Sequence, residues 1–352
     1  MKIFGAELEN RAVEALNSCL NKIPFLKIED IVREPLKEQI RPDLLVKIAL
    51  PDGKKLLVVE IKSIGQPRLA REAVNQLLRY RGLFPDVYGV FVAPYISPKA
   101  AEICAQEEIG YVDLVGNCRL SFGQVYIEQE GRPNLFAKKR DLRSLYSPKA
   151  ERVLRVLLNN PKKAWKTKEL ADEAQVSLGQ VSNVKKLLMD REWVQTEKSG
   201  FFLGEPEPLL KEWVENYSFR RNRVTDYYSL KNVADVEAGL AKLCKQKGLL
   251  YAFTSFSGAA RLAPSVRYQR VFAYIGETEE DITSLLGFKK VTGGANVSLL
   301  FPYDEGVFYG TREIDESMIA SSIQIFLDLS SFRGRGEEAA SALLKQVIVK
   351  QW

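Results

Sequence analysis

The sequence contains no histidine among its 352 residues. This absence excludes Ser-His-Asp and Cys-His nucleophiles, and it excludes zinc sites of the metalloprotease, zinc-finger and deaminase types, which need an imidazole ligand. Any catalysis must therefore use carboxylates, lysine, tyrosine, hydroxyl groups and metal ions bound by oxygen.

Cysteine is also scarce, and long apolar runs are missing. The four cysteines lie far apart and form no CxxC pair, at Cys19, Cys104, Cys118 and Cys244. Neither a zinc ribbon nor a disulfide framework is indicated, and the pattern fits a reducing compartment. The first residues lack the apolar stretch of a signal peptide, and no apolar run approaches the ~20 residues of a membrane span. We therefore predict a cytoplasmic protein that has no membrane partner.

The net charge is small, because 51 Lys and Arg residues against 45 Asp and Glu residues give +6. This bias permits a polyanionic partner without requiring one. The length and the 46% apolar content predict two to three packed domains. Changes of pattern predict an α/β domain over residues 1–136, a basic linker over 137–147, a helical module with a short hairpin over 148–204, and an α+β domain over 205–352.

The most informative pattern is a pair of apolar strands on either side of a Pro-Asp-Gly turn at residues 51–53. Such a pair predicts a β-hairpin. If the turn is centred on its Asp-Gly pair, Asp43 faces Lys62 and Leu45 faces Glu60. Because side chains alternate, one face of the hairpin is then entirely apolar, and Asp43, Glu60 and Lys62 gather at one end of the other face.

Two carboxylates and an ammonium group at one place suit a hard divalent cation. Mg²⁺ prefers oxygen ligands, and the Ile61 carbonyl beside Glu60 can supply a third. Lys62 can orient or deprotonate a metal-bound water and stabilise charge on a phosphate, as phosphodiester hydrolysis requires. The alternative is an ordinary exposed sheet end that carries a salt bridge.

The spacing from Pro42-Asp43 to Glu60-Ile61-Lys62 resembles the PD-(D/E)XK nuclease superfamily. Its folds place a helix with an acidic residue before the hairpin, and residues 5–13 resemble the opening helix of archaeal Holliday-junction resolvases. Gln76 and Tyr80, one helical turn apart, match the QxxxY element of RecB-like nucleases. The resemblance therefore implies a restriction-endonuclease-like α/β/α domain over roughly the first 125 residues.

The resemblance also implies roles for individual residues. It implies that Mg²⁺ or Mn²⁺ is held by Glu9, Asp43 and Glu60, that Lys62 positions the attacking water, and that Gln76 and Tyr80 line the site. Glu7 and Glu14 are the substitutes for Glu9 on the first helix. For Gln76 and Tyr80 the alternative is an exposed amide and a half-buried ring.

In the second segment, Ser147-Pro148 predicts a helix cap followed by a first-turn proline. Helices are predicted over residues 148–159, 167–174 and 177–188, and two short strands over residues 193–203. The tight connection after the second helix is similar to helix-turn-helix modules, and the two strands resemble the wing of a winged helix.

In such modules the second helix of the pair enters the major groove with polar side chains against base edges. The residues implied here for DNA binding are Gln180, Ser182 and Asn183 for bases, and Lys185, Lys186 and Lys198 for phosphates. Winged helices also serve as protein–protein modules, and this helix is only moderately basic. Both DNA binding and protein binding therefore stay open for this segment.

The third domain carries weaker signals. Residues 249–261 form an apolar run that is predicted to enter a small-residue turn and a helix, and residues 293–304 predict a strand beside a loop. Residues 333–336 (Arg-Gly-Arg-Gly) are predicted to lead into the last helix. Two arginine groups are interpreted as exposed charge, with phosphate binding as the alternative: Arg220, Arg221 and Arg223, and separately Arg333 and Arg335. The closing segment, together with residues 257–260, resembles the C-terminal region of AbiEi-type antitoxins. That family pairs this region with a winged helix and acts as a transcriptional autorepressor in toxin–antitoxin and phage-defence systems.

These resemblances lead to two hypotheses. The first is a Mg²⁺-dependent nuclease that cleaves phosphodiester bonds and is directed to DNA by its winged helix. The alternative is a non-catalytic transcriptional regulator or antitoxin of a type IV toxin–antitoxin or phage-defence system, whose first domain is a scaffold. A weaker third hypothesis is protein–protein assembly. The partners expected are DNA, a cognate toxin protein under the second hypothesis, and a second copy in a homodimer.

Overall fold

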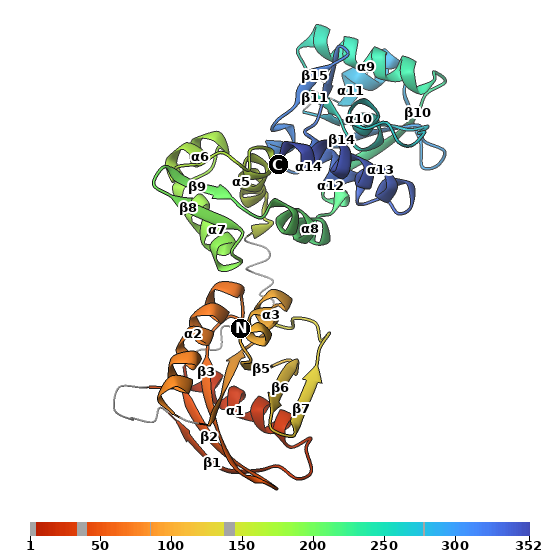
Figure 1. Ribbon diagram of the computed structural model, residues 1–352. Helices are drawn as coiled ribbons and strands as arrows, with labels where there is room; N and C mark the ends of the chain where they lie inside the picture. The colour runs from red at the N-terminus through yellow and green to blue at the C-terminus, as the bar shows by residue number, and fades with distance from the viewer. Residues whose placement is uncertain (1–4, 34–40, 85, 137–144, 277–278) are drawn as a thin grey trace. The chain divides into compact units, whose positions relative to one another are not determined.

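The structure is a computed structural model that describes residues 5–33, 41–84, 86–136, 145–276 and 279–352 (Figure 1). Most of the predicted basic linker, residues 137–144, lies outside these ranges. The chain forms two compact units, Met1–Asp141 with Leu188–Glu192, and Leu142–Leu187 with Trp193–Trp352. The domain boundaries at residues 136, 148 and 204 stay predictions.

Within the described part of the first unit, one seven-stranded sheet runs in chain order from edge to edge. Its strands are β1 (Lys27–Arg33), β2 (Leu44–Leu50), β3 (Gly53–Ile61), β4 (Val87–Ala93), β5 (Gly110–Asp113), β6 (Cys118–Phe122) and β7 (Val125–Gln129). Strands β3, β4 and β5 pair parallel, and the other neighbours pair antiparallel. The helices are α1 (Ala6–Leu20), α2 (Pro67–Leu83) and α3 (Pro98–Gln106). Helices α2 and α3 form the crossovers that parallel strands need.

Helices cover both faces of this sheet. Leu16 of α1 lies in a core with Leu44 and Val59 from one face. On the opposite face, α2 and α3 pack against a second core that includes Val58 and Phe91. Strand β4 is buried along its whole length because both of its faces are covered. The predicted mixed α/β architecture is confirmed.

The predicted hairpin of β2 and β3 is confirmed, but its predicted register is wrong. Leu50 pairs with Gly53, so the turn consists of two residues and is centred one residue earlier than predicted. Leu45 therefore pairs with Val58 rather than with Glu60. Continued by one residue, the observed register places Asp43 opposite Glu60 instead of Lys62. Because the register differs by two residues, each side chain keeps its predicted face, and the apolar face is as expected.

Residues 148–203 form three helices and a hairpin, in the predicted order. They are α5 (Pro148–Asn159), α6 (Thr167–Glu173), α7 (Leu178–Asp190), β8 (Val194–Glu197) and β9 (Gly200–Leu203). Ser147 is the N-cap of α5 and Pro148 opens its first turn, as predicted. Between α6 and α7, Gln175 has a φ of 53°, and this left-handed backbone makes the connection tight.

A second seven-stranded sheet lies in the described residues beyond this module, in the order β13-β10-β14-β12-β11-β16-β15. Its strands are β10 (Arg223–Tyr228), β11 (Tyr251–Phe253), β12 (Val271–Ile275), β13 (Lys289–Lys290), β14 (Val297–Phe301), β15 (Arg312–Ile314) and β16 (Ser317–Ile319). Around it lie α8 (Pro206–Asn216), η1 (Phe219–Arg221), α9 (Val233–Lys247), α10 (Ser255–Leu262), α11 (Glu279–Leu286), η2 (Glu305–Phe308), α12 (Ser322–Leu329), α13 (Arg335–Leu343), η3 (Leu344–Ile348) and α14 (Val349–Gln351). The helix predicted after the apolar run is α10, and the predicted small-residue turn lies inside this helix. The helix predicted at Arg-Gly-Arg-Gly is α13, which begins within that segment at Arg335 and is followed by η3 and α14.

Helix α5 connects the two parts of the second unit. Most of its side chains are buried, including the charged Glu151 and Arg155. It contacts α6 and β9 of the helical module and also α12 and η2 of the C-terminal part. A helix that is buried on nearly all sides belongs to an interior rather than to a surface. No helix in the described ranges is long and apolar enough to cross a membrane.

Candidate functional site

The first candidate site lies at the end of the β2–β3 hairpin. Asp43 directly precedes β2, Glu60 is the second-last residue of β3, and Lys62 follows that strand. The Asp43 carboxylate accepts a hydrogen bond from the Ile61 backbone N–H, with Oδ2 at 2.6 Å from the nitrogen. This bond and the hairpin register hold the two carboxylates on facing strands at the same end of the sheet.

Glu60 is buried, with 3% of its side chain exposed, and both of its oxygens have partners. Oε1 accepts from the Tyr80 hydroxyl at 3.1 Å, and Oε2 accepts from the Lys62 ammonium at 3.1 Å. Burial raises the pKa of Glu60, and the nearby Asp43 raises it further, while Lys62 and Tyr80 oppose the shift. Burial disfavours the ionised form of this carboxylate, and a positive charge close to it favours that form.

Helix α2 supplies the other side of this site. Gln76 and Tyr80 are one turn apart on α2, and the Gln76 amide oxygen accepts from Lys62 Nζ at 2.6 Å. Lys62 is therefore held between an acid of β3 and an amide of α2. Burial and the charge of Glu60 raise the pKa of Tyr80, so its hydroxyl remains a hydrogen-bond donor to Glu60.

The donor chemistry of this group fits Mg²⁺ or Mn²⁺. Two carboxylates, Asp43 and Glu60, face each other, and the ion usually takes one or two such ligands together with water and substrate phosphates. Each carboxylate oxygen can accept more than one contact, so the bonds to Tyr80 and Lys62 leave Glu60 able to bind a cation. Asp43 and Glu60, the two predicted side-chain ligands on the hairpin, thus lie at the same end of the sheet, and their role as metal ligands stays a prediction.

The structure does not gather the predicted third acid with them. Glu9 lies on α1, which packs on the face of the sheet opposite α2. Among the residues that the structure describes, no three Asp, Glu or Cys side chains form a group able to hold a metal ion. The sequence spacing could not reveal this, because it does not specify which face a helix covers.

The predicted DNA-binding residues lie on α7 and on the β8–β9 turn. The side chains of Ser182, Asn183, Lys186 and Lys198 are exposed, and those of Gln180 and Lys185 are half-buried. Lys185 Nζ lies over the Phe201 ring, 4.6 Å from its centroid, and this contact ties α7 to β9. The structure therefore exposes Ser182, Asn183 and Lys186 on α7, and Lys198 at the tip of the adjacent hairpin.

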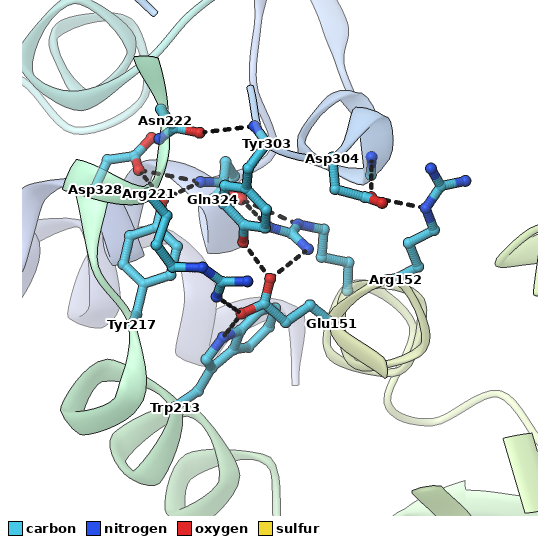
Figure 2. Close-up of polar contacts among 12 residues, drawn as sticks. Glu151, Arg152, Trp213, Tyr217, Arg221, Asn222, Tyr303, Asp304, Gln324 and Asp328 are labelled. Carbon is cyan, nitrogen blue, oxygen red and sulfur yellow. Dashed lines mark hydrogen bonds and ion pairs between the residues drawn. The ribbon is translucent and has the colours of Figure 1, made fainter. Parts of the chain in front are cut away.

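A buried polar network in the second unit was not predicted (Figure 2). Glu151 of α5 accepts hydrogen bonds from Trp213, Arg221 and the Tyr303 hydroxyl. Arg221 is therefore half-buried in an ion pair, and its interpretation as an exposed charge is wrong. The sequence signal was the presence of Glu151 and Arg155 one turn apart, beside the apolar stripe of Val153, Val156 and Leu157.

The same network continues into the core of the C-terminal part. Arg155 donates through Nε and Nη2 to Gln324 Oε1, at 3.0 and 2.8 Å. The Gln324 amide group donates in turn to Tyr217, Tyr274 and Asp328. Burial raises the pKa of Asp328, and hydrogen bonds to its carboxylate oppose that shift. These side chains are fully buried, so the network fixes α5 rather than binding a ligand.

Comparisons with known proteins bear on both units. A crystal structure of a repair endonuclease from Pyrococcus abyssi is 17% identical over 31% of this chain and 47% of that chain, with a TM-score of 0.24. Structures of EndoMS with double-stranded DNA and in its apo form are also 17% identical over 29% of this chain, with TM-scores of 0.21. The chain spans less than half of the length of these structures.

No curated protein matches the chain. Residues 203–349 match the model of a family described as transcriptional regulator, AbiEi antitoxin, type IV TA system, so the resemblance of the C-terminal part to that family is confirmed.

Proposed function

We propose that this protein is a metal-dependent nuclease that binds DNA. The observation that carries the proposal is the hydrogen-bonded group at the end of the β2–β3 hairpin. Its members are Asp43, Glu60, Lys62, Gln76 and Tyr80. Two facing carboxylates beside a fixed ammonium group are the components that phosphodiester hydrolysis uses.

Each residue has a defined role in this proposal. Asp43 and Glu60 hold Mg²⁺ or Mn²⁺, and the bound ion supplies Lewis-acid stabilisation of charge on the phosphate. Glu9 is left out of the ligand set because the described residues contain no group of three such side chains able to hold a metal ion. Lys62, steadied by Glu60 and Gln76, donates a hydrogen bond to the attacking water or to a phosphate oxygen. Tyr80 keeps the Glu60 carboxylate oriented.

We further propose that α5, α6, α7 and the β8–β9 hairpin act as a winged helix that binds DNA. Support comes from the tight α6–α7 connection and from exposed Ser182, Asn183 and Lys186 on α7. Polar side chains on such a helix reach base edges, and lysines neutralise phosphates. Lys198 adds a positive charge at the tip of the hairpin.

Cleavage assays test the catalytic part. The wild type should cut DNA only when Mg²⁺ or Mn²⁺ is added, with single-stranded, duplex and branched substrates tried in parallel. Asp43→Ala and Lys62→Ala should each lose most of the activity, on the order of a hundredfold or more, because each removes a group acting on the reacting phosphate. Asp52→Asn, an exposed change in the turn of the same hairpin, is the matched control. Absence of metal-dependent cutting, or equal cutting by Lys62→Ala, contradicts the proposal.

The family match favours a second function, a non-catalytic regulator or antitoxin with a cognate toxin as partner. Under this alternative the protein binds DNA from its own upstream region and cuts nothing. Fluorescence anisotropy with that DNA should show binding by the wild type. Binding should be weaker in the double variant that carries both Gln180→Ala and Asn183→Ala. Binding with no cleavage under any metal condition would favour the regulator over the nuclease.

A further inference from the structure

Two cysteines that are distant in sequence lie together in the core of the first unit. Cys19 is in the last turn of α1 and Cys118 is the first residue of β6. Their sulfur atoms are 3.0 Å apart, although 99 positions separate them in the chain. The other two cysteines, Cys104 and Cys244, are buried as well and have thiols in the structure.

The distance is short enough for a covalent bond after a small movement. A disulfide has a sulfur–sulfur bond of about 2.0 Å, so the two sulfurs need to approach by only about 1 Å. Both side chains are nearly inaccessible, with 3% of Cys19 and 1% of Cys118 exposed. A bulky disulfide reagent is therefore a poor oxidant for this pair, whereas hydrogen peroxide is small enough to enter when the end of α1 opens locally.

The surroundings give the two sulfurs different roles. The Cys19 thiol donates its hydrogen to Cys118, and this bond, with help from Lys22 and Arg132, lowers the pKa of Cys118 to about 7. The same hydrogen bond and burial raise the pKa of Cys19. Burial alone raises the pKa of Cys104 to about 12 and that of Cys244 to about 11. The thiolate is the reactive form of cysteine, so Cys118 is the sulfur best prepared to react.

We propose that Cys19 and Cys118 form a redox modification site, at which peroxide produces an intramolecular disulfide that ties α1 to β6. The Cys118 thiolate attacks a peroxide oxygen, the O–O bond breaks, and the departing hydroxide takes a proton to become water. Cys118 is now a sulfenic acid. The Cys19 sulfur loses its proton and attacks Cys118, the S–S bond forms and the S–O bond breaks, and a second water leaves. Two thiols are oxidised and one peroxide is reduced.

The bond would fix the C-terminal end of α1 against the sheet. Helix α1 is held there by apolar contacts, and a covalent link across a long loop restricts the unfolded chain strongly. A disulfide in this place therefore protects the first unit under oxidative conditions. The proposal does not depend on nuclease activity or on DNA binding.

The test uses the full chain treated with hydrogen peroxide, unfolded, alkylated and weighed by mass spectrometry. Four alkylated cysteines should fall to two, a Cys19–Cys118 cross-linked peptide should appear, and a dithiol reductant should restore all four. The variant with Cys104→Ser and Cys244→Ser should form the same cross-link. Cys118→Ala and Cys19→Ala should each abolish it, and either variant suffices if the other does not fold.

Folding must direct the pairing, so the same oxidation in urea is the second control. The unfolded chain should give mixed pairings among its cysteines, whereas the folded chain should give mainly the Cys19–Cys118 bond. The melting temperature of the oxidised protein should exceed that of the reduced protein. Four free thiols after treatment, over-oxidised cysteines without a cross-link, or pairing through Cys104 or Cys244 would overturn the proposal.

Discussion

At the scale of single residues, Glu60 is an acid whose surroundings oppose its charge. Burial and Asp43 raise its pKa in the folded protein above the ordinary value of 4.5. The pKa of Glu60 is therefore higher in the folded protein than in the unfolded chain. In that case the contribution of Glu60 to stability is fully present below the pKa of the unfolded chain, and it is lost as pH rises through the pKa of the folded protein. The ionised acid therefore costs stability at neutral pH, and a bound cation would offset this cost.

The first prediction concerns Glu60→Gln, which keeps the shape of the side chain without its charge. We expect the variant to melt at a higher temperature than the wild type above the folded pKa. The difference should shrink as pH falls toward 4.5, where the wild-type acid becomes protonated in both states. Thermal melts of the metal-free protein across this range measure the effect.

Glu107→Gln provides the control for this series. This exposed residue follows α3, and a surface substitution of this kind changes stability by about 0.5 kcal/mol or less. A Glu60→Gln variant that is less stable than wild type at every pH would show that the attraction to Lys62 outweighs the burial of the charge.

Single residues also show how far the sequence alone could identify the site. The motif spacing predicted that Asp43, Glu60, Lys62, Gln76 and Tyr80 lie together, and the structure brings them together because strand and helix periodicity place their side chains on one side of the sheet. Their catalytic roles stay predictions. The role of Glu9 stays a prediction, because spacing along the chain does not determine how α1 packs on the sheet. The acid in the network, Glu151, was not identified, since its partners Arg221 and Tyr303 lie 70 and 152 positions away.

At the scale of elements, the η2 segment of the C-terminal part contacts the helical module. Asp304 caps η2 through the Gly306 backbone N–H and also accepts from Arg152 Nε of α5 at 2.7 Å. Arg152 reaches on to Gln175 in the α6–α7 connection, with Nη1 at 3.4 Å from Oε1. The Tyr309 hydroxyl, just after η2, donates to Glu173 of α6 at 2.9 Å. These contacts steady the connection that orients α7.

The second prediction tests this support with Asp304→Asn, which can keep the cap but loses the charge that Arg152 uses. The ion pair is only 12% and 7% exposed. A hydrogen bond between charged groups contributes about 1.5–3 kcal/mol when it is shielded from water, so we expect a loss of this order. Amide hydrogen exchange should become faster around Gln175 and remain unchanged in the first-unit sheet.

Glu313→Gln is the matched control, because its ion pair with Lys245 is highly exposed, at 52% and 69%. Such surface pairs contribute about 0–1 kcal/mol. If Asp304→Asn has no more effect on exchange near Gln175 than this control, η2 does not support the α6–α7 connection.

Elements were predicted well where local patterns determine them. Alternation along β2 and β3 identified the hairpin and both of its faces, and the Ser147-Pro148 cap identified the start of α5. The register was wrong because a Pro-Asp-Gly sequence allows more than one centre for the turn. Only hydrogen bonding between the strands, from Leu50 to Gly53 onward, selects among them.

At the scale of the whole molecule, α5 makes the helical module and the C-terminal part of the second unit interdependent. Glu151 and Arg155 have no exposed side-chain surface and form an ion pair with each other. Their hydrogen bonds go to side chains beyond residue 204, namely Trp213, Arg221, Tyr303 and Gln324. From the sequence, the boundary between these two parts was predicted at the Gly-Glu-Pro segment, residues 204–206, where the composition changes. Burial of α5 from both sides is a tertiary feature that composition does not reveal.

The third prediction follows from this interdependence. Glu151→Ala leaves Arg155 and Arg221 without their buried acid, and removing one partner of a buried ion pair costs about 3–5 kcal/mol. Because the network joins both parts, amide exchange should accelerate by a similar factor in α7 and in the β10–β14–β12 strands. Lys211→Ala, which removes an exposed pair on α8, should change neither. Faster exchange confined to residues 148–204 would instead mean that the helical module unfolds by itself. In that case the Glu151 network would only attach it to an independent C-terminal domain.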